Sequence, residues 1–208
     1  EDAPAGDAPA ETTADEGPAG IDWDAFFAPR DWTDDGKTRV VLLHTNDMHS
    51  FVQGLGPQAD FTPDALDADG TLGGFSRLAS LIERERRDPR PGASVMAVDA
   101  GDFTFGSAFA SLARTKGLEL HLMEAMGYTA TTLGNHEMDW SPAGTARVVN
   151  AGIEDATNLQ ILASNLVFAD GDAADADLEA LMGKKIHPYR VVTLDNGVKV
   201  GLFGLIGE

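Results

Sequence analysis

The sequence predicts an α/β fold built around a largely parallel sheet. Short apolar runs, typical of buried strands, alternate with longer amphipathic segments, typical of helices, and this alternation favours helices packed on a sheet. Residue types that bind metals follow three of the expected strands directly, at the edge where open α/β sheets bind ligands. The expected strands are residues 40–43, 94–98, 129–133 and 161–164, and the expected helices are residues 73–87, 107–126 and 142–151.

The elements follow from their residue patterns. Residues 40–43 are continuously apolar, as expected of a strand buried on both faces. The apolar stripe of the first helix consists of Phe75, Leu78, Leu81 and Ile82. Gly117 is expected to break the second helix. Residues 189–194 and 198–206 predict a hairpin, whose Asn196-Gly197 pair suits a type I′ turn.

Two parts of the chain are expected to differ in organisation. Residues 1–37 are an acidic tail, rich in Ala and Pro, followed by a docking segment, and residues 38–208 are the folded domain. Residues 1–20 have the composition of a disordered segment. The docking segment is expected to pack on the domain through its aromatic residues, which are Trp23, Phe26, Phe27 and Trp32.

The composition restricts the class of partner. Asp and Glu number 34 against 15 Lys and Arg, which gives a formal net charge of −19 at pH 7. This charge argues against a nucleic acid polymer, because a basic surface is what neutralises phosphates. A small phosphorylated substrate remains compatible, since bound divalent cations can dominate the field of a pocket. The chain has no cysteine and no apolar run near the roughly 20 residues of a transmembrane span.

Three runs at strand ends carry the residues best suited to catalysis. They are Thr45-Asn46-Asp47-Met48-His49, Ala100-Gly101-Asp102 and Gly134-Asn135-His136-Glu137-Met138-Asp139. Asp47 and His49 can reach one cation from a single turn, and Asp102 has two oxygens with which to bridge two cations. Asn135 offers a neutral carbonyl oxygen to the second. Paired divalent ions of this kind activate water and stabilise a phosphoryl group.

His136 and Asp139 are the candidate catalytic pair. The imidazole can donate to a phosphate oxygen or to a leaving group, and the carboxylate can hold its orientation. Simpler interpretations exist, because a single Asp at a strand end is more often a helix N-cap than a ligand. His44 is expected to be packed or to support a ligand, and Glu137 is expected to brace its loop.

These motifs resemble those of a known family. The runs 43–49, 73–75, 99–102 and 134–139 are similar to the calcineurin-like metallophosphoesterases, and most similar to their exported 5′-nucleotidase and cyclic-phosphodiesterase branch. The similarity extends from about Arg39 to the last residue. It implies a layered fold in which helices flank central sheets, and an exported location that is periplasmic, secreted or at the cell surface.

The resemblance also implies roles for individual residues. Asp47, His49 and Asp102 would ligate one metal ion, Asp102 and Asn135 would ligate the other, and His136 with Asp139 would form the catalytic dyad. The ions would be Zn, Mn, Co or Fe. The implied reaction is hydrolysis of a phosphate ester, most simply of a nucleotide, by metal-activated water.

The family pattern continues beyond this sequence. It adds a lone His and a Gly-His-x-His run, which supply further metal ligands, and a C-terminal domain that binds the nucleotide. The chain is therefore expected to be the N-terminal part of such an enzyme, incomplete at the C-terminus. Two alternatives stay open, namely a 2′,3′-cyclic-nucleotide phosphodiesterase and a non-catalytic binding module that retains the fold.

Overall fold

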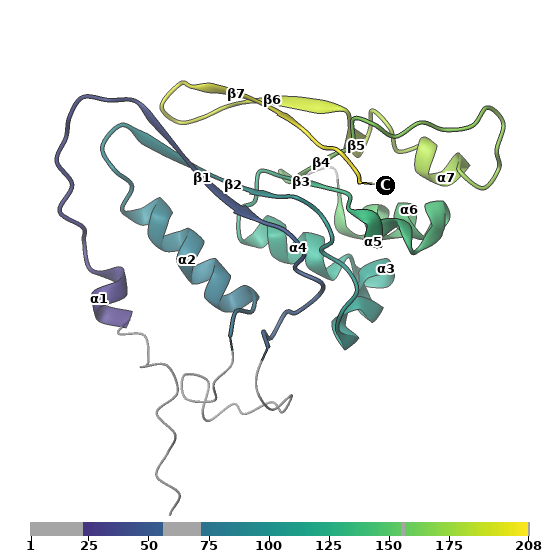
Figure 1. The fold of residues 1–208 in the computed structure, drawn as a ribbon, viewed down its shortest axis with the longest axis horizontal. Helices are drawn as coiled ribbons and strands as arrows, with labels where there is room; N and C mark the ends of the chain where they lie inside the picture. Colours follow the sequence, from purple (N-terminus) through teal and green to yellow (C-terminus); the bar gives the residue numbers. More distant parts are fainter. Residues whose placement is uncertain (1–22, 56–71, 155–156, 208) are drawn as a thin grey trace, which may run out of the picture. The chain divides into compact units, whose positions relative to one another are not determined.

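A computed structural model describes residues 23–55, 72–154 and 157–207 (Figure 1). The chain divides into two compact units, residues 1–28 with 55–72, and residues 29–54 with 73–208. The described part of the first unit contains helix α1 (Trp23–Phe27) and an antiparallel bridge between Leu55 and Leu72. The disorder expected for residues 1–20 falls outside the described residues.

The second unit contains the predicted parallel sheet. Its strands lie in the order β1 (Arg39–Thr45), β2 (Ala93–Asp99), β3 (Ala130–Thr132), β4 (Gln160–Leu162) and β5 (Ile186–His187). Every neighbouring pair is parallel. The carboxyl ends of all strands therefore meet at one edge of the sheet, which confirms the predicted class.

The helices that connect the strands are α2 (Phe75–Arg87), the 3-10 helix η2 (Ala108–Leu112), α3 (Ala113–Lys116), α4 (Leu118–Ala125), α5 (Asn135–Met138), α6 (Ser141–Gly152) and α7 (Ala176–Glu179). Among them α2 and α4 lie along one face of the sheet (Figure 1). Apolar side chains of the helices join those of the strands in one core. Leu120, Met123, Val149 and Ile161 are fully buried there, and burial of each such side chain contributes about 1.5–3 kcal/mol.

Gly117 breaks the second helical region as predicted. It separates α3 from α4 with a left-handed φ of 55°. A Cβ atom at this position would lie 2.3 Å from the backbone of Gly152 on α6. Only glycine fits both the conformation and the close approach of the two helices.

One expectation for β1 is wrong. Its residues alternate in exposure, and Val40 and Leu42 are 40% and 54% exposed. The expected burial on both faces fails because β1 is an edge strand and its helices cover one face only. A continuous apolar run is therefore compatible both with a strand whose two faces are buried and with one, like β1, whose second face is exposed.

The hairpin is confirmed, but its turn differs from the prediction. β6 (Tyr189–Thr193) and β7 (Lys199–Phe203) pair antiparallel. Gly197 has a φ of 82° and its N–H donates to the carbonyl of Leu194 at 2.8 Å, whereas Asn196 has no positive φ. A type I′ turn requires a positive φ at both central residues, Asn196 and Gly197. The connection is therefore a three-residue loop with glycine in the left-handed position. Asn196 instead donates its side-chain amide to the carbonyl of Arg39 at 2.7 Å.

The segment before β1 contacts the end of α2. The indole of Trp32 donates to the carbonyl of Asp88 at 3.2 Å, and Arg30 pairs with Glu85 and Asp88 at 2.8 and 3.1 Å. The guanidinium groups of Arg30 and Arg90 lie over the Trp32 ring. In the described parts of the chain, no helix combines the length and the apolar character needed to cross a membrane.

Candidate metal centre

Backbone pairing continues past the ends of β1 and β2 and joins the first two motif loops. The N–H groups of Asp47 and His49 donate to the carbonyls of Gly101 and Asp102, each at 3.0 Å. The Ser50 N–H donates to the next carbonyl at 2.9 Å. The two loops therefore run side by side, and this pairing places Asp47 and His49 beside Asp102.

Four non-glycine residues of these loops have left-handed backbones. Their φ angles are 53° at Asp47, 46° at His49, 54° at Ser50 and 55° at Asp102. Each such conformation costs on the order of 1–3 kcal/mol and persists only when its surroundings enforce it. Strain of this kind concentrates at functional sites, and here three of the four strained residues, Asp47, His49 and Asp102, are expected metal ligands.

The third loop reaches Asp102 because two glycines allow a close approach. A Cβ atom on Gly101, whose φ is 94°, would lie 2.6 Å from the nitrogen of Gly134. A Cβ atom on Gly134 would lie 2.1 Å from the Asp102 Oδ1. That oxygen accepts a 2.8 Å hydrogen bond from the backbone N–H of His136. Asp102 therefore serves the first turn of α5 as a capping acceptor, in addition to facing the cluster.

His49, Asp102 and His136 form a compact group of donors. Their ligand atoms all lie within 4.8 Å of one another. The rings of His49 and His136 meet edge to face with centroids 4.9 Å apart. Asp47 joins them, because its Oδ1 lies 3.6 Å from His49 Nε2 and its carboxyl interacts with that of Asp102. The amide of Asn46, which donates to Asp47, lowers the pKa of this carboxyl.

The donor set fits a divalent cation of the borderline class. Two imidazoles and a carboxylate are common ligands of zinc, manganese, cobalt and iron. Ligand atoms about 2.0–2.2 Å from one ion are at most about 4.4 Å apart. The ligand atoms here lie within 4.8 Å of one another, so small side-chain movements would bring all three within bonding distance of one ion. Asn135, the expected ligand of a second ion, is exposed at the first position of α5, directly before His136.

The candidate catalytic pair is formed. His136 Nδ1 lies 2.8 Å from Asp139 Oδ2, and both side chains are partly exposed. This hydrogen bond raises the pKa of His136 above its ordinary value. It also leaves Nε2 as the imidazole atom available to the cluster, in the arrangement by which a carboxylate orients a histidine.

Glu137 braces the loops, as its motif position predicted. It is fully buried. One of its oxygens accepts the N–H groups of Asp102 and Gly134 at 2.9 and 2.8 Å, and the other accepts the N–H and hydroxyl of Thr104, each at 2.9 Å. Burial raises the pKa of this carboxyl, and the four donors oppose that effect. Glu137 thus joins the second and third loops beneath the donor group.

Other supporting residues had no role assigned to them from the sequence. Asp99 ends β2 and accepts the hydroxyls of Thr45 and Thr131 at 2.7 and 2.8 Å, and burial raises its pKa to about 6. The ring of Phe105 lies 5.9 Å from that of His136 and stacks on Trp140 at 4.2 Å. These contacts join residues that are distant in sequence, so periodicity does not reveal them.

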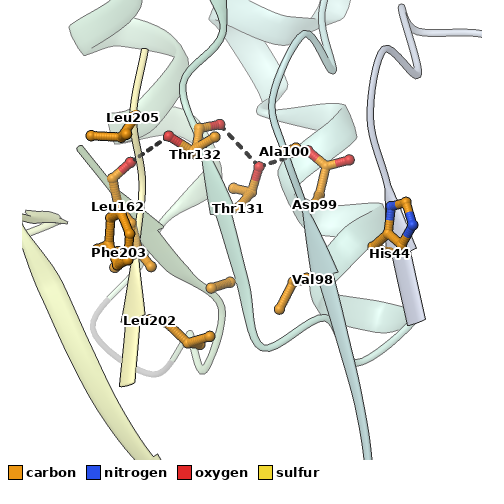
Figure 2. Close-up of a pocket in the computed structure, with 11 residues that line it drawn as sticks. His44, Val98, Asp99, Ala100, Thr131, Thr132, Leu162, Leu202, Phe203 and Leu205 are labelled. Carbon is orange, nitrogen blue, oxygen red and sulfur yellow. Dashed lines mark hydrogen bonds between the residues drawn. The ribbon is translucent and has the colours of Figure 1, made fainter. Parts of the chain in front are cut away.

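A separate cavity of about 360 Å³ adjoins the strand ends, between the sheet and β7 (Figure 2). Asp99 and His44 line it together with apolar side chains such as Leu202 and Phe203. His44 is exposed and not packed, contrary to one expectation, because it lies on the open face of β1. The donor residues of the candidate metal centre are not among those that line this cavity.

The chain is similar in sequence to known 5′-nucleotidases. Over 167 residues the chain is 30% identical to a 5′-nucleotidase of Bos taurus, covering 79% of this chain and 26% of that protein. A 5′-nucleotidase of Homo sapiens is 29% identical over 175 residues, covering 83% and 27%. No family model matches the chain.

Solved structures give the same result for the fold. A 5′-nucleotidase precursor from Thermus thermophilus has a TM-score of 0.59 and 26% identity, covering 79% of this chain and 28% of its own. A calcineurin-like phosphoesterase of Bacillus subtilis has a TM-score of 0.51 and 24% identity, covering 79% and 47%.

Sequence and fold therefore agree that the chain resembles the calcineurin-like phosphoesterases. Within that class it is similar to the 5′-nucleotidases, and it spans about a quarter of the length of these curated relatives. The resemblance predicted from the motifs is confirmed.

Removal of the Asp139 carboxylate tests the candidate dyad. In metal-free protein, Asp139→Asn is expected to lower the pKa of His136, because the charged acceptor that favours the imidazolium is lost. The ¹H NMR titration of the His136 ring measures this shift, with the rings of His121 and His187 as internal references. An unchanged titration of His136 would show that the 2.8 Å contact does not control its protonation.

Proposed function

We propose that this chain carries the metal centre of a metal-dependent phosphoric ester hydrolase that releases phosphate from nucleotides. The observation that carries the proposal is the meeting of three loops at Asp102. Its backbone pairs with the His49 loop, its carboxylate accepts from the His136 loop, and the donor atoms of all three residues lie within 4.8 Å. Relatives named 5′-nucleotidase support the choice of substrate class.

In this proposal the donor residues have distinct roles. Asp47, His49 and Asp102 would hold one divalent ion, and Asp102 and Asn135 would hold a second. Bound ions of this kind supply an activated water and offset the charge of the phosphoryl group. The strained backbones of the first two loops hold the ligands ready, so little rearrangement is needed when a metal binds.

His136 is the proposed proton donor to the leaving oxygen. Asp139 orients its ring through Nδ1 and favours its protonated form, so that Nε2 presents a proton toward the substrate. Neither residue is needed as a ligand in this scheme. Because His136 belongs to the compact donor group, its alternative role is that of a further protein ligand, and measurement of metal affinity in His136→Ala separates the two roles.

The proposed substrate and location follow from the relatives. A nucleotide carries the phosphate ester that such a centre hydrolyses, and the portion of the relatives beyond this chain would bind the rest of the nucleotide. An exported location is part of the proposal, supported by a similar snake venom 5′-nucleotidase of Gloydius brevicauda, which is 29% identical over 170 residues.

The test is a hydrolysis assay on the purified chain with Mn²⁺, Co²⁺ or Zn²⁺. Released phosphate or p-nitrophenol is measured for AMP and p-nitrophenyl phosphate, ring opening of 2′,3′-cyclic AMP to a nucleoside monophosphate is measured by chromatography, and metal binding is measured in parallel by calorimetry. Metal-dependent hydrolysis of p-nitrophenyl phosphate that EDTA abolishes is the expected result, and faster hydrolysis of AMP than of the cyclic ester would support the nucleotidase. Preference for the cyclic ester would favour the phosphodiesterase, metal binding without hydrolysis would favour a binding module, and failure to bind metal would overturn the proposal.

A further inference from the structure

A third buried carboxylate, besides those of Asp99 and Glu137, lies on a helix that the proposed chemistry does not use. Glu119, near the start of α4, is 1% exposed. Its Oε1 accepts a 2.6 Å hydrogen bond from the hydroxyl of Ser50. Its Oε2 is buried without a hydrogen-bond partner among the described residues.

Ser50 links this carboxylate to the first ligand loop. It directly follows His49, it is fully buried, and both residues have left-handed backbones, at φ 46° and 54°. Its N–H donates to the carbonyl of Phe103 at 2.9 Å, and its own carbonyl accepts from the hydroxyl of Ser107. The backbone conformation of Ser50 therefore helps to set the position of the neighbouring His49 side chain within the donor group.

Packing alone does not account for a glutamate at this position. A buried carboxylate has a large desolvation penalty, and an apolar side chain of similar size would fill the same space without it. One charge-assisted bond offsets only part of that penalty. What the glutamate adds is an acceptor for the Ser50 hydroxyl, which supports the left-handed backbone that the hydrogen bonds with Phe103 and Ser107 also hold.

We propose that Glu119 is a positioning residue for the metal centre, which acts through Ser50 to hold His49 in its ligating geometry. This inference rests on the proposed function. Glu119 accepts the side-chain hydroxyl of the residue that follows the first loop, whereas Glu137 accepts backbone N–H groups of the second and third loops. A buried glutamate therefore contacts the chain at or directly after each of the three loops.

The experiment compares Mn²⁺ affinity in Glu119→Gln, Glu119→Met and Ser50→Ala with the wild-type chain. Glutamine keeps a carbonyl acceptor for Ser50, so its affinity is expected to stay close to wild type. Methionine and the Ser50 variant lose the bond, and the expected weakening is about 10–100-fold, the usual effect of removing a partner of a metal ligand. Met123→Ala, a buried change on the same helix, is the control that lowers stability without altering affinity.

A second readout needs no metal. The hydrogen exchange of the Ser50 amide in metal-free protein is expected to accelerate in Glu119→Met and Ser50→Ala, and to stay slow in Glu119→Gln. Wild-type affinity and slow exchange in the two variants that lose the bond would overturn the inference, and Ser50→Ala decides it if Glu119→Met does not fold. If the wild-type chain binds no Mn²⁺, the proposed function fails, and the exchange rates still decide the role of Glu119.

Discussion

Asp102→Ala is expected to abolish metal-dependent phosphate release, with a loss greater than the roughly 100-fold that removal of a supporting residue can cause. Asp102 is the residue at which all three loops meet. Its carboxylate is the shared ligand in the proposed scheme, so its removal takes a donor from both ions at once. Metal affinity is expected to fall together with the rate, and calorimetry with the phosphate assay measures both.

A second substitution separates the two uses of this side chain. Asp102→Asn keeps an oxygen to accept the His136 N–H but removes the negative charge and one metal-binding oxygen. If Asp102 acted only as a capping acceptor for α5, the asparagine variant would behave as wild type. The metal role predicts that Asn and Ala are almost equally inactive, while the Asn variant retains more of its stability. Retained activity in either variant would remove Asp102 from the bridging role.

Glu137→Leu is expected to destabilise the domain by about 4 kcal/mol or more. The change leaves three backbone N–H groups and one hydroxyl without their acceptor, and each buried donor left unsatisfied costs about 1–3 kcal/mol. That loss is a large part of the roughly 5–15 kcal/mol that holds a typical domain folded. Urea unfolding measures this loss of stability as a lower midpoint concentration of urea, with an unchanged dependence of the unfolding free energy on urea concentration.

Glu124→Leu is the matched control for this prediction. Glu124 also accepts backbone N–H groups, from Asn158 and Leu159 at 3.0 and 2.6 Å, but at a partly exposed position where water can replace it. Its substitution is expected to cost about 1 kcal/mol. Equal destabilisation by the two variants would contradict the assignment of Glu137 as the brace of the second and third loops.

The fold could be predicted because its signals are local in the sequence. Strands and helices follow from apolar periodicity, and Gly117 broke a helix because no other residue fits there. The edge of the sheet that carries the candidate site follows from parallel topology, since residues just after parallel strands must share one edge. Asp47, His49, Asp102 and His136 were therefore expected together and are found together.

The features that escaped prediction depend on contacts between distant segments. The exposure of Val40 and Leu42 depends on which face the helices cover, which an apolar run does not record. The hairpin loop departs from type I′ at Asn196, whose side chain binds the start of β1. Glu119 and Ser50 are 69 residues apart, so no pattern in either segment indicates their hydrogen bond.

Paramagnetic broadening by Mn²⁺ distinguishes a metal centre at these strand ends from binding elsewhere, because the five histidines of the chain lie at different places. Substoichiometric Mn²⁺ is added to the wild-type protein, and the imidazole proton resonances are recorded. The account predicts selective broadening of His49 and His136, with His44, His121 and His187 much less affected. Broadening that spares His49 and His136, or that reaches all five equally, would contradict a metal centre at these strand ends.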